Sequence, residues 1–120
     1  MRNQFTVLGC VGTEPEFREL SSGMRMAKFR LAVRGKRKGQ DHTSWFSVVL
    51  WDRAAEKVGH VKKGNLVVVS GSVLIEEYEH KGEARTSVEV NARDCYVVTM
   101  PRSEREGGGS ASQGDNNEQW

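Results

Sequence analysis

Cysteine is scarce in this 120-residue chain, which contains only Cys10 and Cys95. Two cysteines far apart, without a C-x-x-C pair, exclude a disulfide-rich scaffold and the usual cysteine zinc site. We expect both to be small, buried, apolar side chains in a reducing compartment. A bridge between them would require neighbouring strands, and nothing in the sequence demands one.

Long hydrophobic runs are also lacking. No apolar run approaches the roughly 18 residues of a membrane-spanning helix, and the start Met1–Gln4 leads into no apolar core of a signal peptide. We therefore expect a cytoplasmic protein without membrane contact. Hydrophobic residues at 37% and charged residues at 28% are typical of a soluble globular protein, and the length suits one domain.

Charge of one sign does not dominate either, since the net charge is only +2. Residues 1–100 carry 16 Lys or Arg and 12 Asp or Glu, whereas residues 101–120 carry 2 and 4. The first segment is therefore mildly basic, which suits a polyanionic partner. The second segment is rich in Gly and Ser, and we expect a flexible tail after a folded domain over 1–100.

Alternation of apolar and polar residues predicts strands in the first segment. In residues 26–33, Phe29 and Leu31 fall on one side and Lys28 and Arg30 on the other, as in a half-buried strand. Further strands are predicted over residues 4–12, 45–51, 66–77 and 86–99.

One helix and several turns separate these strands. The segment Asp52–Val58 contains good helix formers, begins with an acidic residue and is followed by Gly59. A turn is predicted at Lys62–Asn65, and hairpin tips at 34–40 and 80–83. Three strands, a short helix and two strands are the order of an all-β, five-stranded Greek-key barrel of the OB type.

Two tryptophans share one side of the third predicted strand. Trp45 and Trp51 alternate with Phe46 and Leu50, which take the other side. A strand tryptophan ordinarily belongs to the core, but here the other side already supplies a core face, so we expect exposed indoles and a buried or interfacial Phe46. Tyr78 fits a core role and an exposed role equally well. Exposed rings stack on unpaired bases, with about 1 to 3 kcal/mol per base and little regard to base identity.

Basic residues are interleaved with these rings. The run Arg34–Lys38 is usually only a solvated loop, but it continues a strand that carries Lys28 and Arg30 and so extends a stripe of cations. Affinity for a nucleic acid should fall with salt, with a slope of about −0.7 per phosphate neutralised. The candidate contacts to single-stranded DNA are Trp45, Trp51, Tyr78, Lys28, Arg30, Arg34, Lys36, Arg37, Lys38, Arg53, Lys62, Lys63 and Arg85.

Catalytic motifs are missing. The three histidines share no short motif, and no phosphate loop or nucleophile elbow is present. Glu76, Glu77 and Glu79 are better interpreted as solvated residues that protect a hairpin from aggregation than as a metal site. We expect no enzymatic activity, no cofactor and no bound metal.

Several motifs occur together in an order known from one protein family. They are Asn3–Gly12 followed by Glu14–Arg18, Trp45–Trp51 with Ala55–Glu56, the pair Lys63–Gly64, and Gly71–Val73 leading to Tyr78. In these motifs the chain resembles the bacterial-type single-stranded DNA-binding proteins over residues 3–99. The resemblance places Trp45, Trp51 and Tyr78 where the family has base-stacking rings, and Arg53 and Arg85 near its phosphate contacts.

The resemblance also implies assembly and a cellular role. It predicts a homotetramer of OB folds, with a dimer as the alternative, that protects exposed strands at the nucleoid during replication, recombination and repair. Two positions depart from the family pattern, with Arg37 in place of a stacking tryptophan and Phe46 in place of an interface histidine. The family's acidic tip is reduced here to Asp115, Glu118 and Trp120, through which we hypothesise recruitment of replication and repair proteins.

Other functions of the same barrel remain open. An OB-fold primosomal accessory protein would act mainly through protein contacts and as a dimer, and its mass in solution would distinguish it. A small enzyme or an RNA chaperone is a third interpretation, because a fold alone does not decide function. Competition between matched DNA and RNA oligonucleotides would test the RNA chaperone.

Overall fold

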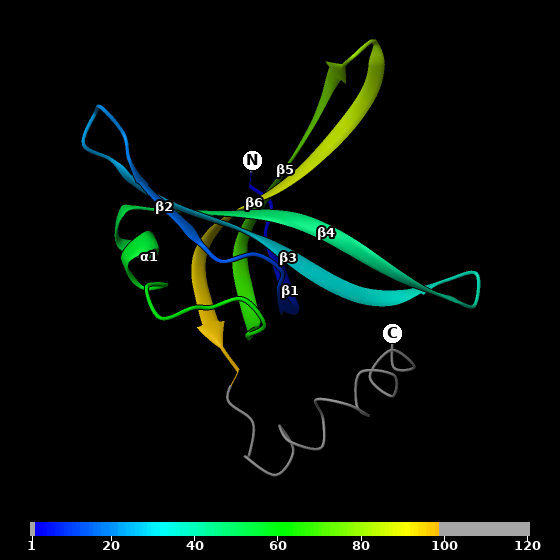
Figure 1. Cartoon of the computed structure of the whole chain (residues 1–120), viewed down its shortest axis with the longest axis horizontal. Coiled ribbons are helices and arrows are strands. Elements are labelled where there is room, and N and C mark those ends of the chain that lie inside the picture. Colours follow the sequence, from blue (N-terminus) through cyan, green and yellow to red (C-terminus); the bar gives the residue numbers. More distant parts are fainter. Residues whose placement is uncertain (1, 99–120) are drawn as a thin grey trace.

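Six strands and one short helix make up the part of the chain that the structure describes, residues 2–98 of a computed structural model (Figure 1). In chain order they are β1 (Phe5–Val11), β2 (Glu16–Glu19), β3 (Arg25–Arg37), β4 (Gln40–Trp51), α1 (Asp52–Glu56), β5 (Leu66–His80) and β6 (Glu83–Val97). Between residues 2 and 98 no helix has the length and apolar character needed to cross a membrane.

The sheet closes because β1 pairs with strands on both sides. The strand order is β1-β5-β6-β4-β3-β2, and β1 also pairs with β3 through Cys10 opposite Ala32 and Val11 opposite Leu31. All pairs are antiparallel except β4 with β6. Five strands thus form a closed barrel, with α1 between its third and fourth strands, and the predicted OB-type fold is confirmed.

The short strand β2 was not predicted. It pairs with β3, with Phe17 opposite Ala27 and Arg18 opposite Met26, and all four of its residues are exposed. Backbone pairing alone holds such an edge strand, so its sequence needs no apolar alternation. This is why the pattern used to find the other strands is absent here.

Two hairpins extend from the barrel as arms, one formed by β3 and β4 and the other by β5 and β6 (Figure 1). The first turns at Lys38 and Gly39, with φ of 52° and 79°, and the second at Lys81 and Gly82, with φ of 53° and 80°. Positive φ at both residues is the backbone of a tight two-residue hairpin turn. The predicted hairpin tip at 34–40 was therefore too long, because residues 34–37 lie in β3.

The inward sides of the barrel strands form one apolar core. Alternate residues of β3, β4 and β5 carry it, as the period of two predicted. The helix is shorter than expected, ending at Glu56, yet Ala55 and Val58 still pack into the core. The largest fully buried side chains are Phe29, Leu31, Leu50, Val11, Val48, Val58, Val67, Val69 and Val90.

The two cysteines lie on different sides of β5. Cys10 on β1 lies opposite Leu66 of β5, and Cys95 on β6 lies opposite Val69 of β5. The two cysteines therefore do not face each other, and both thiols are free. Cys95 is buried as expected, whereas Cys10 is only half-buried. Burial raises the pKa of the Cys95 thiol to about 11, because the apolar surroundings disfavour the thiolate.

Candidate nucleic-acid interface

The pairing of β3 with β4 brings the two sheet tryptophans and two cations to one face. Trp51 lies opposite Met26, Val49 opposite Lys28, and Ser47 opposite Arg30. Residues directly opposite in an antiparallel pair point to the same side of the sheet. Because Phe29 and Leu31 point inward, this face, which we call the tryptophan face, is on the outside of the barrel.

Trp45 is the more open of the two tryptophans on this face. The residue is 48% exposed, and the guanidinium carbon of Arg30 lies 5.0 Å from its ring centroid. A guanidinium at this distance is attracted to the π-system and contributes about 0.5 to 1 kcal/mol at an exposed site. The ring is therefore held by a neighbouring cation while much of its surface stays accessible.

Trp51 is less open than the alternation suggested. It is half-buried at the end of β4, immediately before α1. Two residues lie between the indoles on this side, Ser47 and Val49, and Val49 is only 4% exposed. Asp52, the residue after Trp51, has φ of 48° and accepts a hydrogen bond from the Arg25 backbone nitrogen at 3.0 Å. The chain therefore folds back toward β3 beside Trp51. The tryptophan face is thus accessible at Trp45 and partly covered near Trp51.

Cations follow the tryptophan face along β3 into the first arm. Lys28, Arg30, Arg34 and Lys36 alternate with residues of the other side, and all four are exposed. Lys36 Nζ lies 3.3 Å from the Asp41 carboxylate across the arm. Both partners are solvent-accessible, so this pair contributes at most about 1 kcal/mol and leaves Lys36 available to a phosphate. Arg37 and Lys38, also exposed, end the arm.

The second arm presents Tyr78 and Arg85 on the same side. Parallel pairing places Ser47 of β4 opposite Glu89 of β6, and Glu89 lies opposite Leu74 of β5. Tyr78 is four residues beyond Leu74 with no register shift between them, so it keeps that side, and Arg85 lies directly opposite it. Tyr78 is exposed, which favours the exposed role over the core role.

Three candidate cations lie outside both the strands and the two arms. Arg53 is exposed on α1, and Lys62 and Lys63 are exposed in the loop before β5. The Lys63 backbone nitrogen donates to Glu14 Oε1 at 3.1 Å, which fixes this loop beside the segment after β1. The tail candidates Asp115, Glu118 and Trp120 lie outside the described residues.

Arg18 joins the tryptophan face, although it was not among the predicted DNA contacts and appeared only as the end of the motif Glu14–Arg18. It lies opposite Met26, and Met26 lies opposite Trp51, so the three form one row across β2, β3 and β4. Its guanidinium is 3.5 Å from Glu16 Oε2, in a weak exposed pair. Its place beside Trp51 depends on the pairing of β2, the strand that alternation did not predict.

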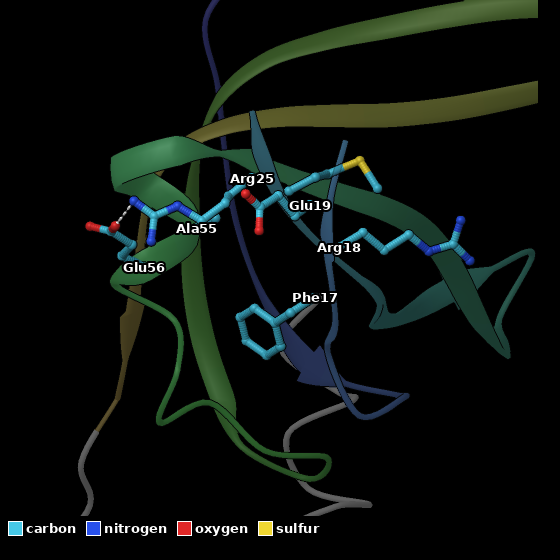
Figure 2. Close-up of a pocket in the computed structure, with 7 residues that line it drawn as sticks. Phe17, Arg18, Glu19, Arg25, Ala55 and Glu56 are labelled. Carbon is cyan, nitrogen blue, oxygen red and sulfur yellow. Dashed lines mark ion pairs between the residues drawn. The ribbon is translucent and has the colours of Figure 1, made fainter. Parts of the chain in front are cut away.

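A pocket of about 330 Å³ is lined by residues of β2, β3 and α1 (Figure 2). Phe17 and Ala55 contribute apolar surface, and an ion pair between Arg25 and Glu56 lies at its edge. In Figure 2, the Phe17 ring and the Arg18 side chain leave β2 in different directions. Arg18 and Met26, which belong to the tryptophan face, also line this pocket. Phe17 lies opposite the core residue Ala27, so its own side chain is not on the tryptophan face.

Comparison with known proteins finds relatives in one family. The sequence profile described as "Single-strand binding protein family" matches residues 2–98. A Nostoc sp. protein named "Single-stranded DNA-binding protein 1" is 33% identical over 110 residues, which cover 90% of this chain and 92% of the relative. A Chlamydia pneumoniae "Single-stranded DNA-binding protein" is 32% identical over 112 residues, 92% of this chain and 69% of the relative. The crystal structure of a small single-stranded DNA-binding protein from Streptomyces coelicolor has a TM-score of 0.70 and 29% identity, covering 81% of this chain and 94% of that chain.

Proposed function

The chain belongs to the single-strand binding protein family, and on this basis we propose that it binds single-stranded DNA on the tryptophan face. Bases stack on Trp45, Trp51 and Tyr78, and phosphates contact the neighbouring Lys and Arg side chains. The observation that carries the proposal is the register of β3 and β4, which places the two indoles beside Lys28 and Arg30. No bond in the substrate is made or broken.

This arrangement favours affinity over sequence selection. Every base has a π-face, so a stacking ring accepts any base at about 1 to 3 kcal/mol each. Guanidinium and ammonium groups attract phosphates, which are the same in every sequence. We propose that the protein therefore covers exposed strands during replication, recombination and repair, at the nucleoid in the cytoplasm.

The assembly that we propose is a homotetramer, with a dimer as the alternative. An outer patch of β1, β5 and β6 supports self-association, because Leu8 lies opposite Val68 and Val68 opposite Tyr96. Leu8 is 40% and Tyr96 63% exposed, and contiguous exposed apolar side chains commonly mark interfaces. A mass of four chains by light scattering supports the tetramer, two chains supports the accessory-protein alternative, and one chain overturns both.

The tail is proposed to recruit replication and repair proteins through Asp115, Glu118 and Trp120. An acidic segment with a terminal aromatic ring offers both charge and apolar surface to a partner. Deleting Glu118–Trp120 should abolish partner binding and leave DNA affinity intact. Partner binding that survives the deletion would end this part of the proposal.

Titration with oligothymidine at two salt concentrations tests the binding function. We expect quenching of tryptophan emission and an affinity that falls as salt rises, since bound phosphates release counterions. A matched oligouridine competitor distinguishes DNA from RNA preference. If no oligonucleotide changes the emission or the anisotropy at low salt, the proposed function is wrong.

A further inference from the structure

Gly12, the residue after β1, lies against the outer edge of the Trp45 indole. A Cβ atom built on Gly12 would be 2.5 Å from Cζ3 and 3.0 Å from Cη2 of that ring. Contacts this short are not tolerated in packed proteins, so the indole occupies space that only a glycine leaves free. The position of the Trp45 ring on β4 therefore depends on Gly12, which lies in the segment between β1 and β2.

The backbone at Gly12 does not itself demand a glycine. The glycines with positive φ in the described chain are Gly23, Gly39, Gly64 and Gly82, and Gly12 is not among them. Alanine is thus compatible with the local conformation, and the requirement at Gly12 is for space beside Trp45. This separates Gly12 from the turn glycines, whose substitution would strain the fold.

Hydrogen bonds hold Gly12 and Arg30 in fixed positions around the ring. The Gly12 nitrogen donates to the Arg30 carbonyl oxygen at 2.7 Å, and the Arg30 nitrogen donates to Thr13 Oγ1 at 3.0 Å. The Arg30 guanidinium then lies over the indole, 5.0 Å from its centroid. Gly12 contacts the edge of Trp45 and Arg30 covers part of its π-surface, so both residues restrict the orientation of the ring before any ligand arrives.

We propose that Gly12 is a positioning residue for DNA binding, which sets the tilt of Trp45 so that its free surface can stack on a base. The inference rests on the proposed function and deepens it. A ring that is already ordered loses little side-chain entropy when a base stacks on it, whereas a displaced ring must be reoriented first. Gly12 touches no base in this scheme and acts through Trp45.

Gly12→Ala tests the proposal with little expected effect on folding. The new methyl group would meet the tip of an exposed side chain, which can swing outward, and the Arg30 carbonyl oxygen would be at 3.4 Å. Gly59→Ala is the matched control, because its Cβ would meet nothing closer than the Glu56 oxygen at 3.7 Å and its φ is not positive. Thermal unfolding of both variants checks that the barrel is intact.

Oligothymidine affinity should fall about 5- to 150-fold in Gly12→Ala, the equivalent of one stacked base, and stay unchanged in Gly59→Ala. The slope of log affinity against log salt should not change, since no phosphate contact is removed. Trp45→Phe lacks the two ring atoms that the methyl group meets, so adding Gly12→Ala in that background should cost no further affinity. Adding it to Trp51→Phe should cost the full amount.

Two results overturn the positioning role. The first is that Gly12→Ala binds oligothymidine as tightly as the wild type, although Trp45→Ala binds it more weakly. The second is that Gly12→Ala reduces affinity in the Trp45→Phe background as much as it does in the wild type. The new methyl group would then act through something other than the indole. In both cases the wild type still binds, so the proposed function survives. A wild type that does not bind refutes the proposed function and this inference with it.

Discussion

Removing the Trp45 ring should weaken DNA binding by the free energy of one stacked base. In the proposed complex this indole stacks on one base, so Trp45→Ala loses about 1 to 3 kcal/mol of binding free energy, or about 5- to 150-fold in affinity. Arg30, which covers part of the ring, remains and is free to meet a phosphate. The salt dependence of binding should therefore be unchanged while the affinity falls.

The same substitution has a calculable effect on stability. Trp45 is 48% exposed as a residue, so its side chain buries only about half of the roughly 150–250 Å² that a buried aromatic side chain removes from water, and the substitution abolishes this burial. At about 25 cal/mol per Å², about 100 Å² corresponds to at most about 2.5 kcal/mol of unfolding free energy. Urea unfolding measures this loss separately, so binding can be compared at a temperature where both proteins are folded.

Fluorescence anisotropy of a labelled oligothymidine is the assay, and Phe17→Ala is the matched control. Phe17 is 53% exposed, much like Trp45, but it lies opposite the core residue Ala27 and therefore on the other side of the sheet from the tryptophan face. Its removal should leave affinity unchanged. The reasoning is refuted if folded Trp45→Ala binds as tightly as the wild type, or if Phe17→Ala weakens binding equally.

Three further predictions concern charge and titration. Lys28→Gln and Arg30→Gln should each reduce the magnitude of the salt slope by about 0.7, as measured by titration at several salt concentrations, and an unchanged slope would exclude a phosphate contact. Asp41→Asn frees Lys36 from its ion pair, so affinity should rise while urea unfolding shifts by less than about 1 kcal/mol; lower affinity would contradict this. The pKa of Cys95 is raised from 9.0 to about 11, so its contribution to stability is complete below pH 9 and is lost as pH rises toward 11, by about 1.4 kcal/mol per pH unit. In Cys95→Val the free energy of unfolding, measured by urea, should not show this fall between pH 9 and 11. An identical pH profile in the variant and the wild type would contradict the attribution of the fall to the Cys95 thiol.

The barrel could be predicted from sequence because its strands bury one side. Phe29 and Leu31 alternate with Lys28 and Arg30, and this period of two exists only because a core must be filled. The arms and β2 have no core to fill. Alternation therefore stops near Val33, and the sequence carries no signal that β3 continues to Arg37.

The chemistry of the site was only partly predictable. The side of the strand that carries Trp45 and Trp51 followed from alternation, but their different exposure depends on how the chain turns back at Asp52. The contacts of Trp45 with Arg30 and Gly12 depend on register and on the segment after β1. Such contacts join residues distant in sequence, and local pattern does not encode them.

A protein with Trp45 as its only tryptophan tests the central claim most directly. Trp51→Phe and Trp120→Phe leave this one indole as the reporter. Titration with oligothymidine should quench its emission and reach a plateau at the stoichiometry given by anisotropy of the labelled strand. Binding by anisotropy without any change in Trp45 emission would show that the strand does not lie on the tryptophan face.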